Sequence, residues 1–147
     1  MSPRLYVYKL TTDNGGAPCI DGGRLLTLAI CMPVIRRMAR VGDFVFGFAG
    51  NSLSRDNRLI YIARVKSVEE DGDYYEKATY QDRGDRIYIR GDDGQFSLLS
   101  DACYHKDGTQ LEHDLGSPPE YERARVLISD DFRYFGSAPD SETADLN

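Results

Sequence analysis

Residues 25–50, LLTLAICMPVIRRMARVGDFVFGFAG, constrain the fold more than any other part of this 147-residue chain. A strand-like apolar run leads to Pro33, which suits the first turn of a helix because the N–H that proline lacks would be unpaired there. Gly42 is the expected C-cap, so the sequence predicts a helix over residues 33–41. An aromatic strand follows at 43–49. This strand–helix–strand order indicates an α+β domain.

Short strand patterns recur along the rest of the chain. Strands are predicted at 4–10, 58–68, 86–90, 95–99 and 124–129, and residues 24–30 form either a short strand or the lead-in to the helix. The strand at 58–68 is expected to pair back on the aromatic strand as a hairpin. The strands at 86–90 and 95–99 are expected to form a second hairpin around a tight turn at 91–94. Residues 101–121 lack periodicity and predict a long surface excursion with room for one short helix. Several short strands with one helix favour a small mixed β-barrel with helical insertions.

Composition predicts one globular domain over residues 1–137, followed by an acidic, disordered tail at 138–147. No apolar run approaches the roughly 20 residues of a membrane span. The N-terminus has no signal-peptide layout, so a cytoplasmic protein without membrane contact is expected.

The predicted helix divides into two arcs at 100° per residue. The apolar arc holds Val34, Ile35, Met38 and Val41, and the opposite arc holds Arg36, Arg37 and Arg40. With Arg24 these arginines make a +4 patch on a protein of net charge −6. Such a patch indicates a small anionic ligand or one phosphate-bearing segment rather than a long duplex. Arg36 and Arg37 could clamp a phosphate through bidentate hydrogen bonds. The alternative is a solvated face paired with carboxylates such as Glu69 or Asp73.

The three cysteines, Cys19, Cys31 and Cys103, are widely spaced and odd in number, which argues against a disulfide framework. Cys103-x-His105 is the one close cysteine–histidine pair, so neither a metal site nor a cofactor is predicted. Cys31 lies at the helix entry, where the helix dipole would lower its pKa. It is either a nucleophile, with His105 or His113 as its base, or a buried and inert thiol.

Asp13 lies in a glycine-rich loop after the first strand. It could accept from the exocyclic amine of a base, act as a general base, or close the loop as an Asx-turn. Phe48 and Tyr134 each border a glycine-rich loop and could stack on a base, although the core is the alternative place for them.

Two family resemblances follow from these motifs. The order Arg4–Leu10, Ile35–Arg40, Gly42–Phe48 and Leu59–Val65 resembles the EVE domains of the PUA-like superfamily, which implies a PUA-like (EVE-like) mixed β-barrel. The run from Asp13-x-Gly15-x-Ala17-Pro18 through Thr27-Leu28-Ala29-x-Cys31-x-Pro33-x-Ile35-Arg36-Arg37 to Gly42-Asp43 resembles the nucleotide modification-associated domain family, second type. The ending Val126–Ser129 with Phe132–Gly136 is also similar to that family.

The second resemblance implies a link to systems that make or handle modified nucleic-acid bases. The prediction is therefore a cleft between the Asp13 loop and the Arg36/Arg37 helix that binds a modified nucleotide or a single flipped base, in a base-modification or phage-defence system. Its expected residues are Asp13, Ala17, Pro18, Cys31, Arg36, Arg37, Asp43, Phe48 and Tyr134. The alternatives are an enzyme that uses Asp13 or Cys31, and a protein-interaction accessory factor. The oligomeric state stays open.

Overall fold

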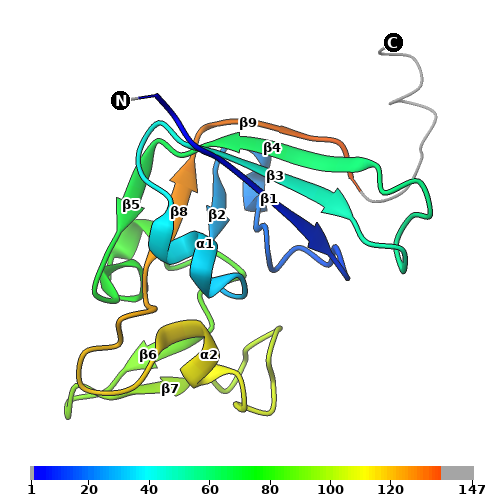
Figure 1. Ribbon diagram of the computed structural model, residues 1–147. Helices are drawn as coiled ribbons and strands as arrows, with labels where there is room; N and C mark the ends of the chain where they lie inside the picture. Colours follow the sequence, from blue (N-terminus) through cyan, green and yellow to red (C-terminus); the bar gives the residue numbers. More distant parts are fainter. Residues whose placement is uncertain (1, 137–147) are drawn as a thin grey trace.

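The computed structural model describes residues 2–136, which form nine strands and two short helices (Figure 1). In chain order the elements are β1 (Leu5–Leu10), β2 (Leu26–Leu28), α1 (Pro33–Met38), β3 (Phe44–Ala49), β4 (Leu59–Arg64), β5 (Ser67–Glu69), β6 (Tyr88–Arg90), β7 (Phe96–Leu98), α2 (Leu111–Leu115), β8 (Val126–Ser129) and β9 (Asp131–Tyr134). The predicted tail at 138–147 lies outside the described residues.

The strands make three sheets. The first has the order β1-β3-β4-β9, in which β1 runs parallel to β3 and the other pairs are antiparallel. The second has the order β2-β8-β5 and is antiparallel throughout, and β6 with β7 forms the predicted hairpin. The prediction of a single strand over 58–68 is wrong, because the chain passes there from β4 in the first sheet to β5 in the second. Val65 donates its N–H to Asp43 at the end of the first sheet, and Lys66 donates to Ile128 in the second.

The α+β class is confirmed, but the described strands form open sheets and no closed barrel is found among residues 2–136. The chain leaves the first sheet after β4 and builds a second sheet from β2, β8 and β5. The edge strands β1 and β9 therefore have no partner through which the first sheet could close. The PUA-like topology remains a prediction.

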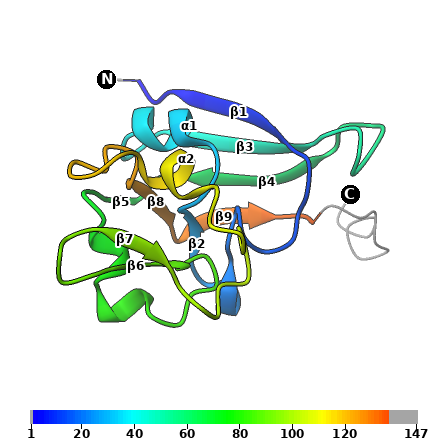
Figure 2. The same cartoon turned by 90° about the horizontal axis from the view of Figure 1, so that it is seen from below.

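Two hydrophobic clusters hold the sheets and helices together. The first packs β1, β3 and β4 against α1 through residues such as Tyr8, Ile35 and Tyr61. The second lies under the β6–β7 hairpin and α2 and is rich in tyrosine, with Tyr75 and Tyr88 at its centre. Both helices lie on the same side of the four-stranded sheet (Figure 2), so one face of that sheet is covered.

Helix α1 differs from its prediction in length and orientation. It ends at Met38 rather than at residue 41, because Ala39 takes an extended conformation (φ −70°, ψ 142°). Arg125 donates its Nη1 to the carbonyl of Ala39 at 2.5 Å and to that of Arg36 at 2.6 Å, which satisfies carbonyls that a helix end leaves free. Gly42 is not the helix cap. It has a φ of 97° in the turn before β3.

The two arcs predicted for this helix are also wrong. Val34, Met38 and Val41 are 62%, 42% and 65% exposed, whereas Arg36 is fully buried. Only Ile35 of the apolar set enters the core. No helix among the described residues has both the length and the apolar character needed to cross a bilayer.

Candidate functional site

A pocket of about 400 Å³ opens between the loop after β1 and the segment before α2. The turn between β2 and α1 contributes Ile30, Cys31 and Met32 to its lining. Tyr104 and His105 line it from the segment that precedes α2. The pocket thus joins three stretches that lie far apart in the sequence.

Cys31 occupies a strained turn between strand and helix. Its φ of 61° and the φ of 43° at Met32 place two consecutive non-glycine residues in the left-handed region, where each costs about 1–3 kcal/mol. Two buried groups hold the Cys31 backbone in place. Asp114 accepts its N–H at 2.8 Å, and the Arg36 Nε donates to its carbonyl at 2.6 Å. Such strain concentrates at sites where a side chain must be presented to a ligand.

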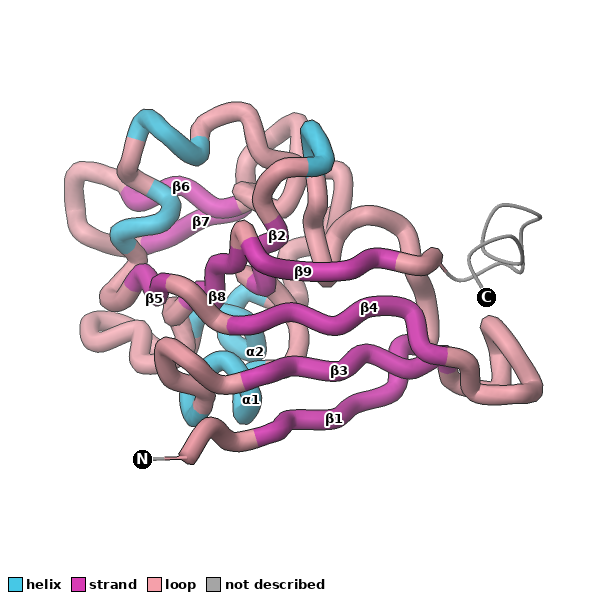
Figure 3. The backbone as a smooth tube through the Cα atoms, turned by 90° about the horizontal axis from the view of Figure 1, so that it is seen from above, coloured by secondary structure: helices cyan, strands magenta, loops and turns pink. Residues whose placement is uncertain are grey.

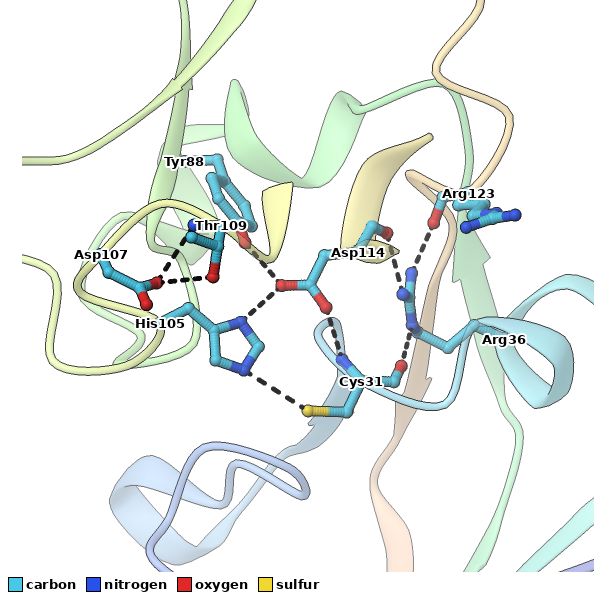
Figure 4. A network of polar contacts seen from close by, with 8 residues as sticks. All are labelled: Cys31, Arg36, Tyr88, His105, Asp107, Thr109, Asp114 and Arg123. Carbon is cyan, nitrogen blue, oxygen red and sulfur yellow. Dashed lines mark hydrogen bonds and ion pairs between the residues drawn. The ribbon is translucent and has the colours of Figure 1, made fainter. Parts of the chain in front are cut away.

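Cys31, His105 and Asp114 form a chain of contacts at the pocket (Figure 4). The Cys31 Sγ lies 3.7 Å from the His105 Nε2, and the His105 Nδ1 lies 2.7 Å from the Asp114 Oδ2. A nucleophile beside a base that is itself oriented by a carboxylate is the arrangement that activates serine and cysteine nucleophiles.

Asp114 is fully buried and anchors this unit from α2. The Tyr88 hydroxyl donates to its Oδ2 at 2.5 Å, and the Cys31 N–H donates to its Oδ1. An ionised carboxylate can only accept hydrogen bonds, so its contact with the His105 Nδ1 assigns the ring proton to that nitrogen. The His105 Nε2 is then left as the acceptor that faces the Cys31 thiol.

Burial raises the pKa of the Cys31 thiol, and the charge of Asp114 raises it further, while Arg36 opposes both. This direction is opposite to the effect expected from the helix dipole. The thiol therefore keeps its proton at neutral pH and needs a base to become a nucleophile. The His105 Nε2 lies close enough to the Cys31 thiol to act as that base.

Arg36 belongs to the scaffold of this site. Its guanidinium donates to the carbonyls of Cys31, Asp114, Arg123 and Arg125, at distances between 2.5 and 3.1 Å. The side chain is fully buried, and burial lowers its pKa. The expectation that Arg36 lies on an exposed arc to meet a phosphate is therefore wrong, because backbone carbonyls of two other segments surround its guanidinium.

The other predicted residues lie in several places. Asp13 accepts a hydrogen bond from the Tyr134 hydroxyl, so these two meet at the edge of the first sheet. Ala17 lines the pocket of Cys31, and Pro18 is buried beside it. The predicted residues thus converge only in part.

Three more of the predicted residues are not among those that line the pocket. Arg37 is exposed on α1, and Phe48 lies on the first sheet. The Asp43 carboxylate accepts the backbone N–H groups of Arg4 and Arg40, both at 2.9 Å, which gives it a structural role.

Sequence reasoning missed Asp114 and Tyr88, and it left the choice between the two histidines open. Asp114 lies 83 positions from Cys31 along the chain and in a segment without periodicity. No local spacing could have paired them. His113 is exposed and is not among the residues that line the pocket.

The same three side chains offer potential metal ligands, with one atom from each of Cys31, His105 and Asp114 within 4.8 Å of the others. The imidazole limits this arrangement. Asp114 contacts the Nδ1, whereas the thiol faces the Nε2, so a metal ion on the Nε2 would have Cys31 as its second ligand and Asp114 on the far side of the ring. The donor set suits proton transfer better than a closed metal site.

A family model, described as nucleotide modification associated domain 2, matches residues 2–147. The chain belongs to this family. No curated protein and no solved structure matches it. The name of the nucleotide modification associated domain 2 family implies involvement in systems that modify nucleotides.

Proposed function

We propose that the protein is an enzyme of nucleotide or base modification in which Cys31 is the nucleophile. His105 is the general base, and Asp114 is a positioning residue that orients the imidazole. The observation that carries this proposal is the continuous contact from Sγ to Nε2 and from Nδ1 to Oδ2, at 3.7 Å and 2.7 Å, in the lining of a pocket. Of the alternatives that the sequence left open, the geometry favours the enzyme that uses Cys31.

The chemistry follows from the protonation states. As the sulfur attacks an electrophilic carbon of the substrate, the thiol proton passes to the His105 Nε2. The sulfur–carbon bond forms as the bond from that carbon to the leaving group breaks, and the imidazolium gives its proton to the leaving group. Water, deprotonated by the same Nε2, then attacks that carbon. The sulfur–carbon bond breaks, the product leaves, and the thiolate takes the proton back from the imidazolium. Whenever the imidazole carries the second proton, Asp114 stabilises its positive charge.

The pocket has features that suit a nucleotide. Lys9 and Lys106 line it, and none of the described residues in its lining is acidic, although the whole protein carries a charge of −6. Two cations beside a nucleophile would hold a phosphate while the base reaches the thiol. The binding of a modified nucleotide, predicted for a cleft at Arg36 and Arg37, is thus proposed for this pocket instead.

The test is covalent trapping followed by turnover. Purified protein is incubated with mixed modified and unmodified nucleotides, and its intact mass is measured with and without an acid quench. We expect an adduct on Cys31 that is lost in Cys31→Ser. Removal of the base in His105→Ala should slow turnover by about 10²–10⁴-fold.

Matched controls exist for each residue. Cys103→Ser removes an exposed thiol that also lines the pocket, and it therefore tests which of the two thiols carries the adduct. His113→Ala removes the other histidine, and Asp107→Asn alters an exposed carboxylate of the same segment. All three should leave trapping and turnover unchanged. An adduct that persists in Cys31→Ser would contradict the proposal. Stoichiometric zinc in the purified protein that is lost in both Cys31→Ser and His105→Ala would favour the metal-site alternative.

A further inference from the structure

The uncovered face of the four-stranded sheet is apolar and aromatic. Cross-strand partners point to the same side of a sheet, and successive residues point to opposite sides. The register therefore places the following side chains on one face: Leu5, Val7 and Lys9 of β1, Phe44, Phe46 and Phe48 of β3, Ile62 and Arg64 of β4, and Asp131 and Arg133 of β9. The opposite face carries Tyr8 and Val45, which belong to the core.

No described segment covers this face. In the view from above, β1, β3, β4 and β9 lie in front and both helices lie behind them (Figure 3). Leu5 and Val7 are 64% and 63% exposed, and the three phenylalanines of β3 are partly exposed. An exposed apolar patch of this kind marks an interaction surface.

The charged residues on this face indicate an anionic partner. Lys9, Arg64 and Arg133 are exposed cations, and Asp131 is the one acid in the set. More cations lie at the Phe44 end of the face. There Arg64 borders a hollow of about 230 Å³ that is also lined by Arg4 and Arg40. The acid in that hollow, Asp43, is occupied by backbone N–H groups. Cations are thus concentrated around this face of an acidic protein.

We propose that this face binds single-stranded nucleic acid. The alternate residues Phe44, Phe46 and Phe48 form a row along β3 on which successive bases can stack, while the flanking cations meet the phosphates. Aromatic platforms with cationic borders are the common means of holding single strands without sequence readout. The Arg64 guanidinium lies over the Phe44 ring, 5.8 Å from its centre, so one of the flanking cations is directly next to the aromatic row.

The face also leads to the pocket. Lys9 pairs with Phe48 in the sheet and lines the pocket of Cys31. A strand that runs along β3 would therefore reach the pocket at its Lys9 end. This inference goes beyond the proposed chemistry and does not depend on it, since the binding face contains neither Cys31 nor His105.

The test measures binding of a fluorescent oligo-dT strand by anisotropy over a range of salt concentrations. With three phosphate contacts, the logarithm of affinity should fall against the logarithm of salt with a slope of about −2. Phe46→Leu keeps an apolar side chain but removes the ring, and it should weaken binding by roughly 5- to 150-fold. Arg133→Gln should reduce the slope by about 0.7.

Three controls separate this proposal from its alternatives. Arg37→Gln removes an exposed arginine of α1, away from the face, and should bind like the unaltered protein. Cys31→Ser should also retain binding, so failure of the enzyme proposal would not be mistaken for failure of this one. Sedimentation at the same concentrations should show that Phe46→Leu leaves the oligomeric state unchanged.

Several results would overturn the inference. These are no binding at low salt, equal affinity for duplex of the same length, and binding that neither Phe46→Leu nor Arg133→Gln weakens. If the protein self-associates and Phe46→Leu converts it to a monomer, the face would instead be the contact with a second copy of the chain.

Discussion

Arg36 and Asp114 bring two opposite charges into one buried hydrogen-bonded unit, and Cys31 lies between them. Arg36 donates to the Cys31 carbonyl, and Asp114 accepts the Cys31 N–H. The guanidinium is tolerated there because four backbone carbonyls accept its protons. At the scale of single residues, the backbone of Cys31, the proposed nucleophile, is therefore held by two buried charged side chains.

The first prediction concerns the stability that Arg36 provides. Arg36→Met should lower the free energy of unfolding by at least about 3 kcal/mol, because it leaves buried carbonyls without donors. Arg37→Met, the exposed neighbour, should change it by less than about 0.5 kcal/mol. Urea unfolding of both variants measures the difference. Equal effects would show that the Arg36 contacts contribute nothing to stability.

The second prediction concerns the pH dependence of Cys31. Because burial and Asp114 raise the pKa of the thiol, its neutral form is favoured in the folded protein. In a Cys19→Ser, Cys103→Ser background, alkylation by iodoacetamide should therefore speed up with rising pH. The midpoint should lie above the value of about 8.5 for a free thiol. A rate that is already constant at acidic pH would instead indicate a preformed thiolate–imidazolium pair.

At the scale of elements, close packing inside the first sheet decides which residues β3 can carry. Its apolar residues alternate between the core and the uncovered face, but Gly47 breaks the series on the core side. A Cβ at Gly47 would lie 2.3 Å from the Tyr61 ring and 2.8 Å from the Leu10 side chain. The ring of Tyr61 thus occupies the space above β3, where its hydroxyl reaches Tyr8 at 2.8 Å.

The third prediction tests this packing. Gly47→Ala should destabilise the protein by about 1–3 kcal/mol, because the fully buried Tyr61 ring has no room to move. Val7→Ala, on the exposed face of the adjacent strand, should cost less than about 0.5 kcal/mol. Thermal unfolding of the two variants makes the comparison. A neutral Gly47→Ala would mean that the ring has another position available.

At the scale of the whole molecule, the core contains many titratable groups that folding keeps protonated. Burial raises the pKa of Tyr61, Tyr74 and Tyr75 well above the ordinary value of tyrosine, and it raises the pKa of Cys19 and Cys31. In the unfolded chain these groups would release protons at their ordinary pKa values. The folded state therefore binds more protons at alkaline pH.

The fourth prediction follows from this difference. Since the folded pKa values are raised, the stabilising contribution of these groups is complete below about pH 8.5 and is lost as pH rises. Above about pH 10 each buried tyrosine removes roughly 1.4 kcal/mol of stability per pH unit. The free energy of unfolding, measured in urea across this range, should fall steeply. A flat profile would show that the tyrosines ionise in the folded protein.

The sequence alone determined the local elements and the family. β-branched and aromatic runs located β1, β3 and the β6–β7 hairpin, because alternation is a property of neighbouring residues. The long motif run predicted the family that the match over residues 2–147 then showed. Cys31 and His105 were also among the residues considered, as a nucleophile and one of two bases.

Only the tertiary structure decided which groups meet. The burial of Arg36 depends on carbonyls of residues 114, 123 and 125, which a helical wheel cannot include. The choice of His105 over His113, and the role of Asp114, depend on how a segment without periodicity folds over the pocket. Contacts between residues some 80 positions apart produce no periodic pattern in a sequence. Hydrogen bonding and packing depend on how close two groups are in space and not on their spacing along the chain.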